Sequence, residues 1–235
     1  MKQWQPIAIA MLATTMASVS HADVIGVKAS ADYWHVQGDV NQAASNSNFN
    51  TANEQSLEKK GTAQLALSVE HPVPLIPNAA IRHTSIKQNA ELNNTAVNEI
   101  KLDNTDYILY YEILDNIVSA DVGIAAKRLD GHVANLSTGA KAEISETLPM
   151  LYAAAGAKLP FTGWRVNAQA LATKYNDVKA TDALAEVKYN FVDNAIVDIG
   201  AKAGYRILDV QLDKENGTQH KMKFHGPFVG FEAHF

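Results

Sequence analysis

Alternation of apolar and polar residues is the feature of this sequence that most constrains its fold. Between residues 196 and 208 the odd positions are apolar (Val197, Ile199, Ala201, Ala203, Tyr205, Ile207) and the even positions are polar or glycine (Asp198, Gly200, Lys202, Gly204, Arg206). A repeat of two is the period at which the side chains of a β-strand alternate between the two faces of a sheet. The same alternation recurs in residues 25–33, 62–70, 118–127 and 182–191. The chain is therefore predicted to be all-β, with strands that carry one apolar and one polar face.

The connections between these segments are of two kinds, which take turns along the chain. Four are tight and turn-forming, at residues 72–77, 115–116, 159–163 and 192–195. Five are longer and polar, at residues 36–60, 89–101, 130–141, 176–180 and 209–219. This pattern predicts about ten strands with both chain ends on the side of the short turns. Eight strands is the alternative that the pattern leaves open.

Strands of this kind, joined by short turns on one side and longer loops on the other, are typical of a transmembrane antiparallel up-and-down β-barrel. In such a barrel the apolar face contacts lipid, the polar face lines the lumen, and closure pairs every backbone group. Aromatic residues on the predicted outer face fall toward both ends of the strands: Tyr33, Tyr107 and Tyr205 on the loop side, and Trp164, Phe191 and Phe235 on the turn side. Two aromatic girdles, one at each membrane interface, are expected for such a barrel.

The N-terminal residues have the pattern of a secretory signal peptide. Lys2 is the only charged residue of residues 1–22, an apolar run covers residues 7–19, and Ser20 and Ala22 are small residues at the positions that precede cleavage. We therefore expect residues 1–22 to be a signal peptide and residues 23–235 to be the barrel domain. After residue 22 no apolar run approaches the roughly 18 residues of a membrane-spanning helix.

Three motifs resemble those of a known family. The chain ends in an alternating segment, residues 226–235 (GPFVGFEAHF), which closes on Phe235. With the segment 110–116 (YYEILDN) and the turn 159–164 (LPFTGW), this ending resembles a family of small, mostly uncharacterised proteobacterial outer-membrane β-barrel proteins. The resemblance implies the barrel fold, a place in the outer membrane of a Gram-negative bacterium, and recognition of Phe235 by the barrel assembly machinery. It carries over no catalytic residues.

The polar faces of the strands carry many charged residues. With the apolar face outward, the lumen receives eight cations (Lys28, Arg82, Lys127, Lys158, Arg165, Lys188, Lys202, Arg206) and eight anions (Asp32, Glu70, Asp106, Glu112, Asp121, Glu186, Asp198, Glu232). Charges removed from water need partners to offset their desolvation. The balanced set therefore predicts a network of ion pairs that fills much of the lumen.

Composition and missing motifs exclude several functions. The net charge is -5 and no run is rich in lysine and arginine, so a nucleic-acid partner is not expected. Cysteine is absent, which excludes disulfides and thiolate chemistry. His220, His225, Asp209, Asp213 and Glu215 cluster around the last loop, yet no G-x-S-x-G or H-E-x-x-H motif accompanies them. We expect no catalytic, cofactor-binding or metal site.

Taken together, these patterns predict an integral outer-membrane β-barrel that acts as a structural or surface protein, or as a narrow channel for small solutes with a largely filled lumen. One alternative is an outer-membrane enzyme of protease or lipase type that acts at the extracellular rim. Another is a soluble periplasmic barrel that binds a ligand, which would have its apolar face inside. The expected partners are outer-membrane lipid, lipopolysaccharide and the barrel assembly machinery, and the expected state is a monomer.

Overall fold

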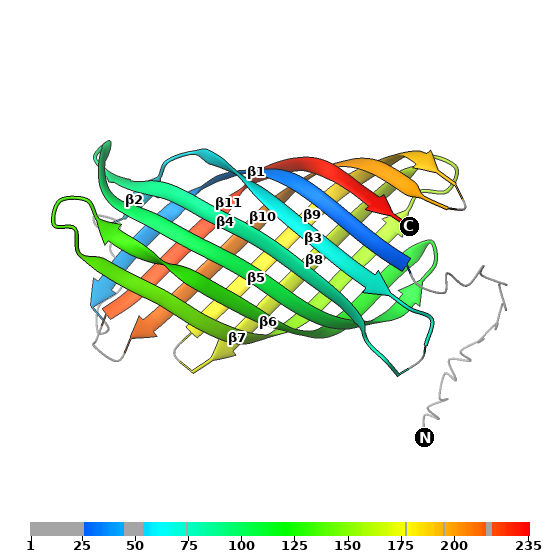
Figure 1. Cartoon of the computed structure of the whole chain (residues 1–235), viewed down its shortest axis with the longest axis horizontal. Helices are drawn as coiled ribbons and strands as arrows, with labels where there is room; N and C mark the ends of the chain where they lie inside the picture. Colours follow the sequence, from blue (N-terminus) through cyan, green and yellow to red (C-terminus); the bar gives the residue numbers. More distant parts are fainter. Residues whose placement is uncertain (1–25, 45–53, 74, 177, 195, 215–217) are drawn as a thin grey trace, which may run out of the picture.

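The computed structural model describes residues 26–44, 54–73, 75–176, 178–194, 196–214 and 218–235. The predicted signal peptide lies outside these residues. The described chain forms one antiparallel sheet that curls into a barrel (Figure 1). Its strands are β1 (Gly26–Ala44), β2 (Gln55–Leu57), β3 (Lys60–Glu70), β4 (Asn78–Leu92), β5 (Thr95–Asp115), β6 (Val118–Asn135), β7 (Lys141–Lys158), β8 (Trp164–Tyr175), β9 (Val178–Asp193), β10 (Asp198–Lys214) and β11 (Thr218–His234).

The sheet closes through pairing of its first and last strands, β1 and β11. Each further strand pairs with its neighbours in the chain, as in an up-and-down barrel. β2 and β3 both pair with β1 on one side and with β4 on the other, so they share one position in the wall. The eleven strands therefore occupy ten positions around the ring, and the all-β, transmembrane up-and-down fold predicted from the alternation is confirmed.

The loops predicted from polar sequence are mostly strand. β1 continues to Ala44, and β4 and β5 are joined only by Asn93 and Asn94, both with positive φ (52° and 61°). A two-residue hairpin turn of this conformation is favourable for asparagine. β4 is 15 residues long and β5 is 21 residues long, whereas a strand of about 9 to 11 residues is enough to cross a bilayer. The predicted long loops at 36–60, 89–101 and 130–141 are therefore wrong in extent, and the barrel is taller than a membrane is thick.

The polarity of the inner and outer faces of the wall reverses halfway along the barrel. In the half near the short turns, which we call the turn half, apolar side chains point outward and polar ones point into the lumen. In the other half, the loop half, β10 buries Leu208, Val210 and Leu212 in the lumen and turns Asp209 and Gln211 outward. The apolar side chains that fill the lumen of the loop half include Trp34, Val36, Ile86, Ile100, Leu102, Leu129, Leu148, Leu171, Val210, Met222 and Phe224. The loop half is thus built as a water-soluble barrel, while the turn half has the faces of a membrane barrel.

The outward aromatic residues mark the boundary between the two halves. Tyr33, Tyr107 and Tyr205 are exposed, as predicted, but they lie midway along β1, β5 and β10 rather than at the strand ends. Trp164, Phe191 and Phe235 are exposed near the turn end. The apolar exterior therefore spans only the turn half. No helix among the described residues is long and apolar enough to cross a membrane.

Candidate functional site

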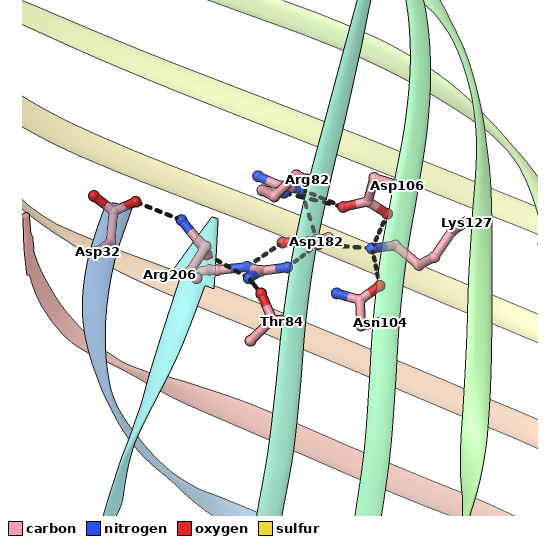
Figure 2. A network of polar contacts seen from close by, with 9 residues as sticks. Asp32, Arg82, Thr84, Asn104, Asp106, Lys127, Asp182 and Arg206 are labelled. Carbon is pink, nitrogen blue, oxygen red and sulfur yellow. Dashed lines mark hydrogen bonds and ion pairs between the residues drawn. The ribbon is translucent and has the colours of Figure 1, made fainter. Parts of the chain in front are cut away.

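The centre of the lumen holds a layer of buried charges, which we call the central layer. It consists of Arg82 on β4, Asp106 on β5, Lys127 on β6, Asp182 on β9 and Arg206 on β10 (Figure 2). Side chains from five of the ten ring positions meet here because each occupies an inward position of its strand at a similar height. Their side chains are at most 5% exposed, so this layer excludes water from the middle of the lumen.

Asp182 is the acceptor on which the three cations of the central layer converge. Its Oδ2 atom lies 2.7 Å from Nη2 of Arg206, 2.8 Å from Nζ of Lys127 and 3.0 Å from Nη2 of Arg82. Its Oδ1 atom accepts a further hydrogen bond of 2.9 Å from Nε of Arg206. Such saturation offsets the desolvation of a buried carboxylate.

Both arginines of the central layer make further contacts. Arg82 donates from Nε and Nη2 to Oδ2 of Asp106, at 3.0 and 2.8 Å. Arg206 donates from Nη1 to Gln64 and Thr84, and its guanidinium carbon lies 4.8 Å from the ring centre of Trp34. The ring of Trp34 belongs to the apolar core of the loop half, so the central layer packs directly against that core.

A second group of charges lies between the central layer and the short turns. Nζ of Lys202 lies 3.3 Å from carboxylate oxygens of both Asp32 and Glu186, and Glu232 pairs with Lys188. Nearer the turn end, Lys28 pairs with Glu70 at 2.6 Å, and the hydroxyl of Tyr110 donates to Glu70 at 2.8 Å. Arg165 pairs with Asp198 at 3.2 Å.

These charges surround a cavity of about 430 Å³ inside the turn half. Its lining runs from the buried Arg82 in the central layer down to Asp115, Ser119 and Lys158 beside the short turns, where Asp115 and Lys158 are exposed to solvent. Toward the loops it ends at the central layer and the apolar core. The described lumen is thus a vestibule that is accessible from the turn side and closed on the loop side.

The structure brings most of the predicted lumen residues into ion pairs. The exceptions within the described part of the chain are Lys158, Glu112 and Asp121, which line the cavity and take part in no ion pair there. The central carboxylate Asp182 was missing from the predicted set. The alternation in residues 182–191 places Asp182 on the polar face of its strand, so this pattern was sufficient to predict that it faces the lumen.

The residues predicted to cluster around the last loop do not form a site in the described chain. Asp209 and His225 point outward on β10 and β11, and Nδ1 of His225 lies 2.6 Å from the hydroxyl of Tyr205. The side chains of Asp213, Glu215 and His220 lie outside the described residues. Among the residues that the structure describes, no group of three or more histidine, aspartate or glutamate side chains could hold a metal ion.

A closed ring of antiparallel strands with an apolar exterior and a charged lumen defines the class: an integral β-barrel of the outer membrane. No protein-family model and no curated protein matches the chain. Among solved structures, it is similar to the outer membrane protease OmpT from Escherichia coli, with a TM-score of 0.50 and 7% identity over 93% of this chain and 99% of that one. At this identity the similarity concerns the fold, which is that of Gram-negative outer-membrane barrels.

Two further solved structures are more distant in shape. The translocator domain of the autotransporter NalP from Neisseria meningitidis has a TM-score of 0.45 and 14% identity, and the alignment covers 88% of each chain. Neisserial surface protein A has a TM-score of 0.34 and 12% identity over 89% of this chain and 99% of that one.

Proposed function

We propose that this protein is a non-conducting barrel of a Gram-negative outer membrane that presents its loop half as a rigid structure at the cell surface. The observation that carries this proposal is the double closure of the lumen. A solute that entered the vestibule would first meet the central layer and then the apolar side chains above it. Both closures would have to rearrange for transport to occur.

The other functions considered from the sequence have less support. A channel requires a continuous path, whereas the described cavity ends at the central layer. An enzyme at the rim requires an acid and a base in contact, whereas Asp209 and His225 point outward and no hydrogen bond or ion pair among the described residues joins them. A soluble periplasmic barrel requires apolar side chains inside along the full height, whereas the turn half carries them outside.

We further propose the partners that the sequence suggested. The exposed apolar band of the turn half suits outer-membrane lipid, and the polar exterior just above it suits the head groups of lipopolysaccharide. Phe235 exchanges two backbone hydrogen bonds with Val27, of 2.9 and 3.0 Å, at the seam where β11 meets β1. A residue at this seam is well placed for recognition by the barrel assembly machinery while the barrel closes. The closed barrel would remain a monomer.

Conductance in planar bilayers tests the proposal. The purified full-length protein should show no stable current steps under conditions in which a general porin, reconstituted in the same membranes, does. Because two closures act in series, Arg206→Ala alone should leave the bilayer silent, whereas Arg206→Ala combined with Phe224→Ala should produce small steps. Stable steps from the unmodified protein would overturn the proposal and establish a channel.

A further inference from the structure

One side of the vestibule carries carboxylates that no cation of the described chain neutralises. Glu112 on β5 and Asp121 on β6 line the cavity, and Asp115 lines it nearer the short turns. Among the described residues, none of these three side chains takes part in an ion pair or a hydrogen bond. Lys28 is already paired with Glu70 at 2.6 Å. We call the three carboxylates the acidic wall.

Strand pairing places two carboxylates of the acidic wall face to face. Glu112 and Asp121 are directly opposite partners on β5 and β6, a position at which like charges destabilise a sheet. Two lysines of the lumen, Lys188 and Lys202, are opposed in the same way. There Glu232 compensates both charges, because it pairs with Lys188 and lies 3.9 Å from Nζ of Lys202. The acidic wall lacks the corresponding cation in the described chain.

A buried hydroxyl group points to the same part of the cavity. Tyr152 on β7 lines the cavity two residues from Ala154, which is the strand partner of Asp121. Tyr152 is only 8% exposed, yet its hydroxyl makes no hydrogen bond with the described residues. The neighbouring ring of Tyr110, 5.7 Å away between ring centres, instead donates its hydroxyl to Glu70. A buried polar group without a partner is costly, so the hydroxyl of Tyr152 is available to a ligand.

The spacing of the acidic wall favours an organic cation with several charges over a metal ion. The described side chains include no group of three or more carboxylates and histidines that could hold a metal ion. Asp115 lies opposite Ser119, which is two residues, or roughly 7 Å, closer to the turns than Asp121 on β6. Two ammonium groups joined by a short methylene chain span a comparable length. The ring of Tyr152 also suits an ammonium group.

We propose that the acidic wall and Tyr152 bind a small linear polyamine that enters the vestibule from the side of the short turns. One ammonium group lies between Glu112 and Asp121 and donates a hydrogen bond to the hydroxyl oxygen of Tyr152. A second ammonium group faces Asp115. The cavity of about 430 Å³ has the size of a small-molecule site. This inference concerns the turn half and does not depend on whether the lumen conducts.

Isothermal titration calorimetry of the full-length protein in an uncharged detergent, near neutral pH, tests the proposal. The probes are spermidine, 1-aminobutane and magnesium chloride. We expect saturable binding of spermidine that is at least tenfold tighter than that of 1-aminobutane, which has a single ammonium group, or of Mg²⁺. Equal binding of the three probes would mean that the vestibule attracts any counterion, and it would overturn the proposal. Absence of spermidine binding would overturn it as well.

A double variant tests the opposed carboxylates. Glu112→Gln with Asp121→Asn should weaken spermidine binding at least tenfold. The matched control is Asp103→Asn with Asp130→Asn, which changes two opposed carboxylates of the same two strands on the outer face, where each has a cation beside it. The control should bind spermidine like the unmodified protein. The lumen variant relieves a repulsion, so it should fold, and heat-modifiable migration on a gel checks this.

Tyr152→Phe tests the hydroxyl group separately from the charges. The variant keeps the ring and removes only the acceptor for the ammonium group. A hydrogen bond to a charged group is strong enough that its loss should weaken spermidine binding about tenfold. Unchanged affinity in Tyr152→Phe or in the lumen double variant, or an equal loss in the outer-face control, would overturn the proposal.

Discussion

At the scale of single residues, Asp182 shows how the lumen tolerates buried charge. Three cations share this carboxylate, while Asp106 pairs with two of them, Arg82 and Lys127. Parity in residues 182–191 is enough to predict that Asp182 points inward. Its central role is not predictable from the sequence, because the heights at which residues of five strands meet depend on the pairing registers, which alternation alone does not determine.

Removal of this carboxylate should destabilise the barrel strongly. Asp182→Ala leaves Arg82, Lys127 and Arg206 buried with Asp106 as the one remaining carboxylate of the central layer. The loss of one partner from a buried ionic group costs about 3 to 5 kcal/mol. Urea unfolding in detergent micelles, followed by tryptophan fluorescence, should report a loss of this size.

An exposed ion pair provides the control for Asp182→Ala. Glu99→Gln removes the 3.3 Å contact with Lys87 on the outer face, where such pairs contribute about 0 to 1 kcal/mol. If the two variants shift the urea midpoint equally, the central layer does not stabilise the barrel as argued.

At the scale of the strands, alternation predicted which face points where but not how far each strand runs. Residues 196–208 were predicted as strand, and β10 continues to Lys214. The sequence pattern did not predict this continuation because its apolar residues, Leu208, Val210 and Leu212, occupy even positions. Between residues 198 and 206 the even positions are polar or glycine. If every strand is assumed to have its apolar residues facing lipid, a switch of the apolar residues from odd to even positions indicates the end of a strand. Physically, it marks the height at which the solvent outside the barrel changes from lipid to water.

Neighbouring alanines of β7 provide a test of facing in the turn half. Ala153 is exposed on the apolar exterior, whereas Ala154 lines the lumen cavity beside Asp121. Ala153→Arg places a cation in lipid, at a cost of about 2 to 4 kcal/mol near the middle of the bilayer. Ala154→Arg places it in a cavity of about 430 Å³ next to a carboxylate. The folded fraction, measured by gel migration without heating, should therefore fall much more for Ala153→Arg. The reverse order would show that the inward and outward residues of β7 are assigned wrongly by one position.

At the scale of the whole molecule, the barrel consists of a membrane half and a projecting half. Eight residues separate Tyr107 from Asp115 at the end of β5, which corresponds to roughly 20 Å along the membrane normal for a tilted strand. The apolar band of an outer-membrane barrel is about 25 Å tall. The turn tips should therefore lie at the inner interface, which explains why Leu75, Phe161 and Ile196 can be fully exposed there. The band leaves no room for the loop half inside the membrane.

Labelling of single cysteines should locate both boundaries of the membrane half. The natural chain has no cysteine, so each variant carries one reactive thiol. Asp130→Cys, outward on β6 in the loop half, should react with a membrane-impermeant maleimide in intact cells. Val122→Cys, outward on the same strand within the apolar band, should react only after the barrel is unfolded by heating in detergent.

Asp193→Cys, at the turn end of β9, provides the orientation control and should react only after the outer membrane is permeabilised. The outward residues of β6 change from Val122, Ile124 and Ala126 to Arg128 and Asp130. That change predicts a boundary between positions 126 and 128. Equal labelling of Val122→Cys and Asp130→Cys in intact cells would contradict the two-half description. Labelling of Asp193→Cys in intact cells, with Asp130→Cys protected, would show that the barrel is inserted in the opposite direction.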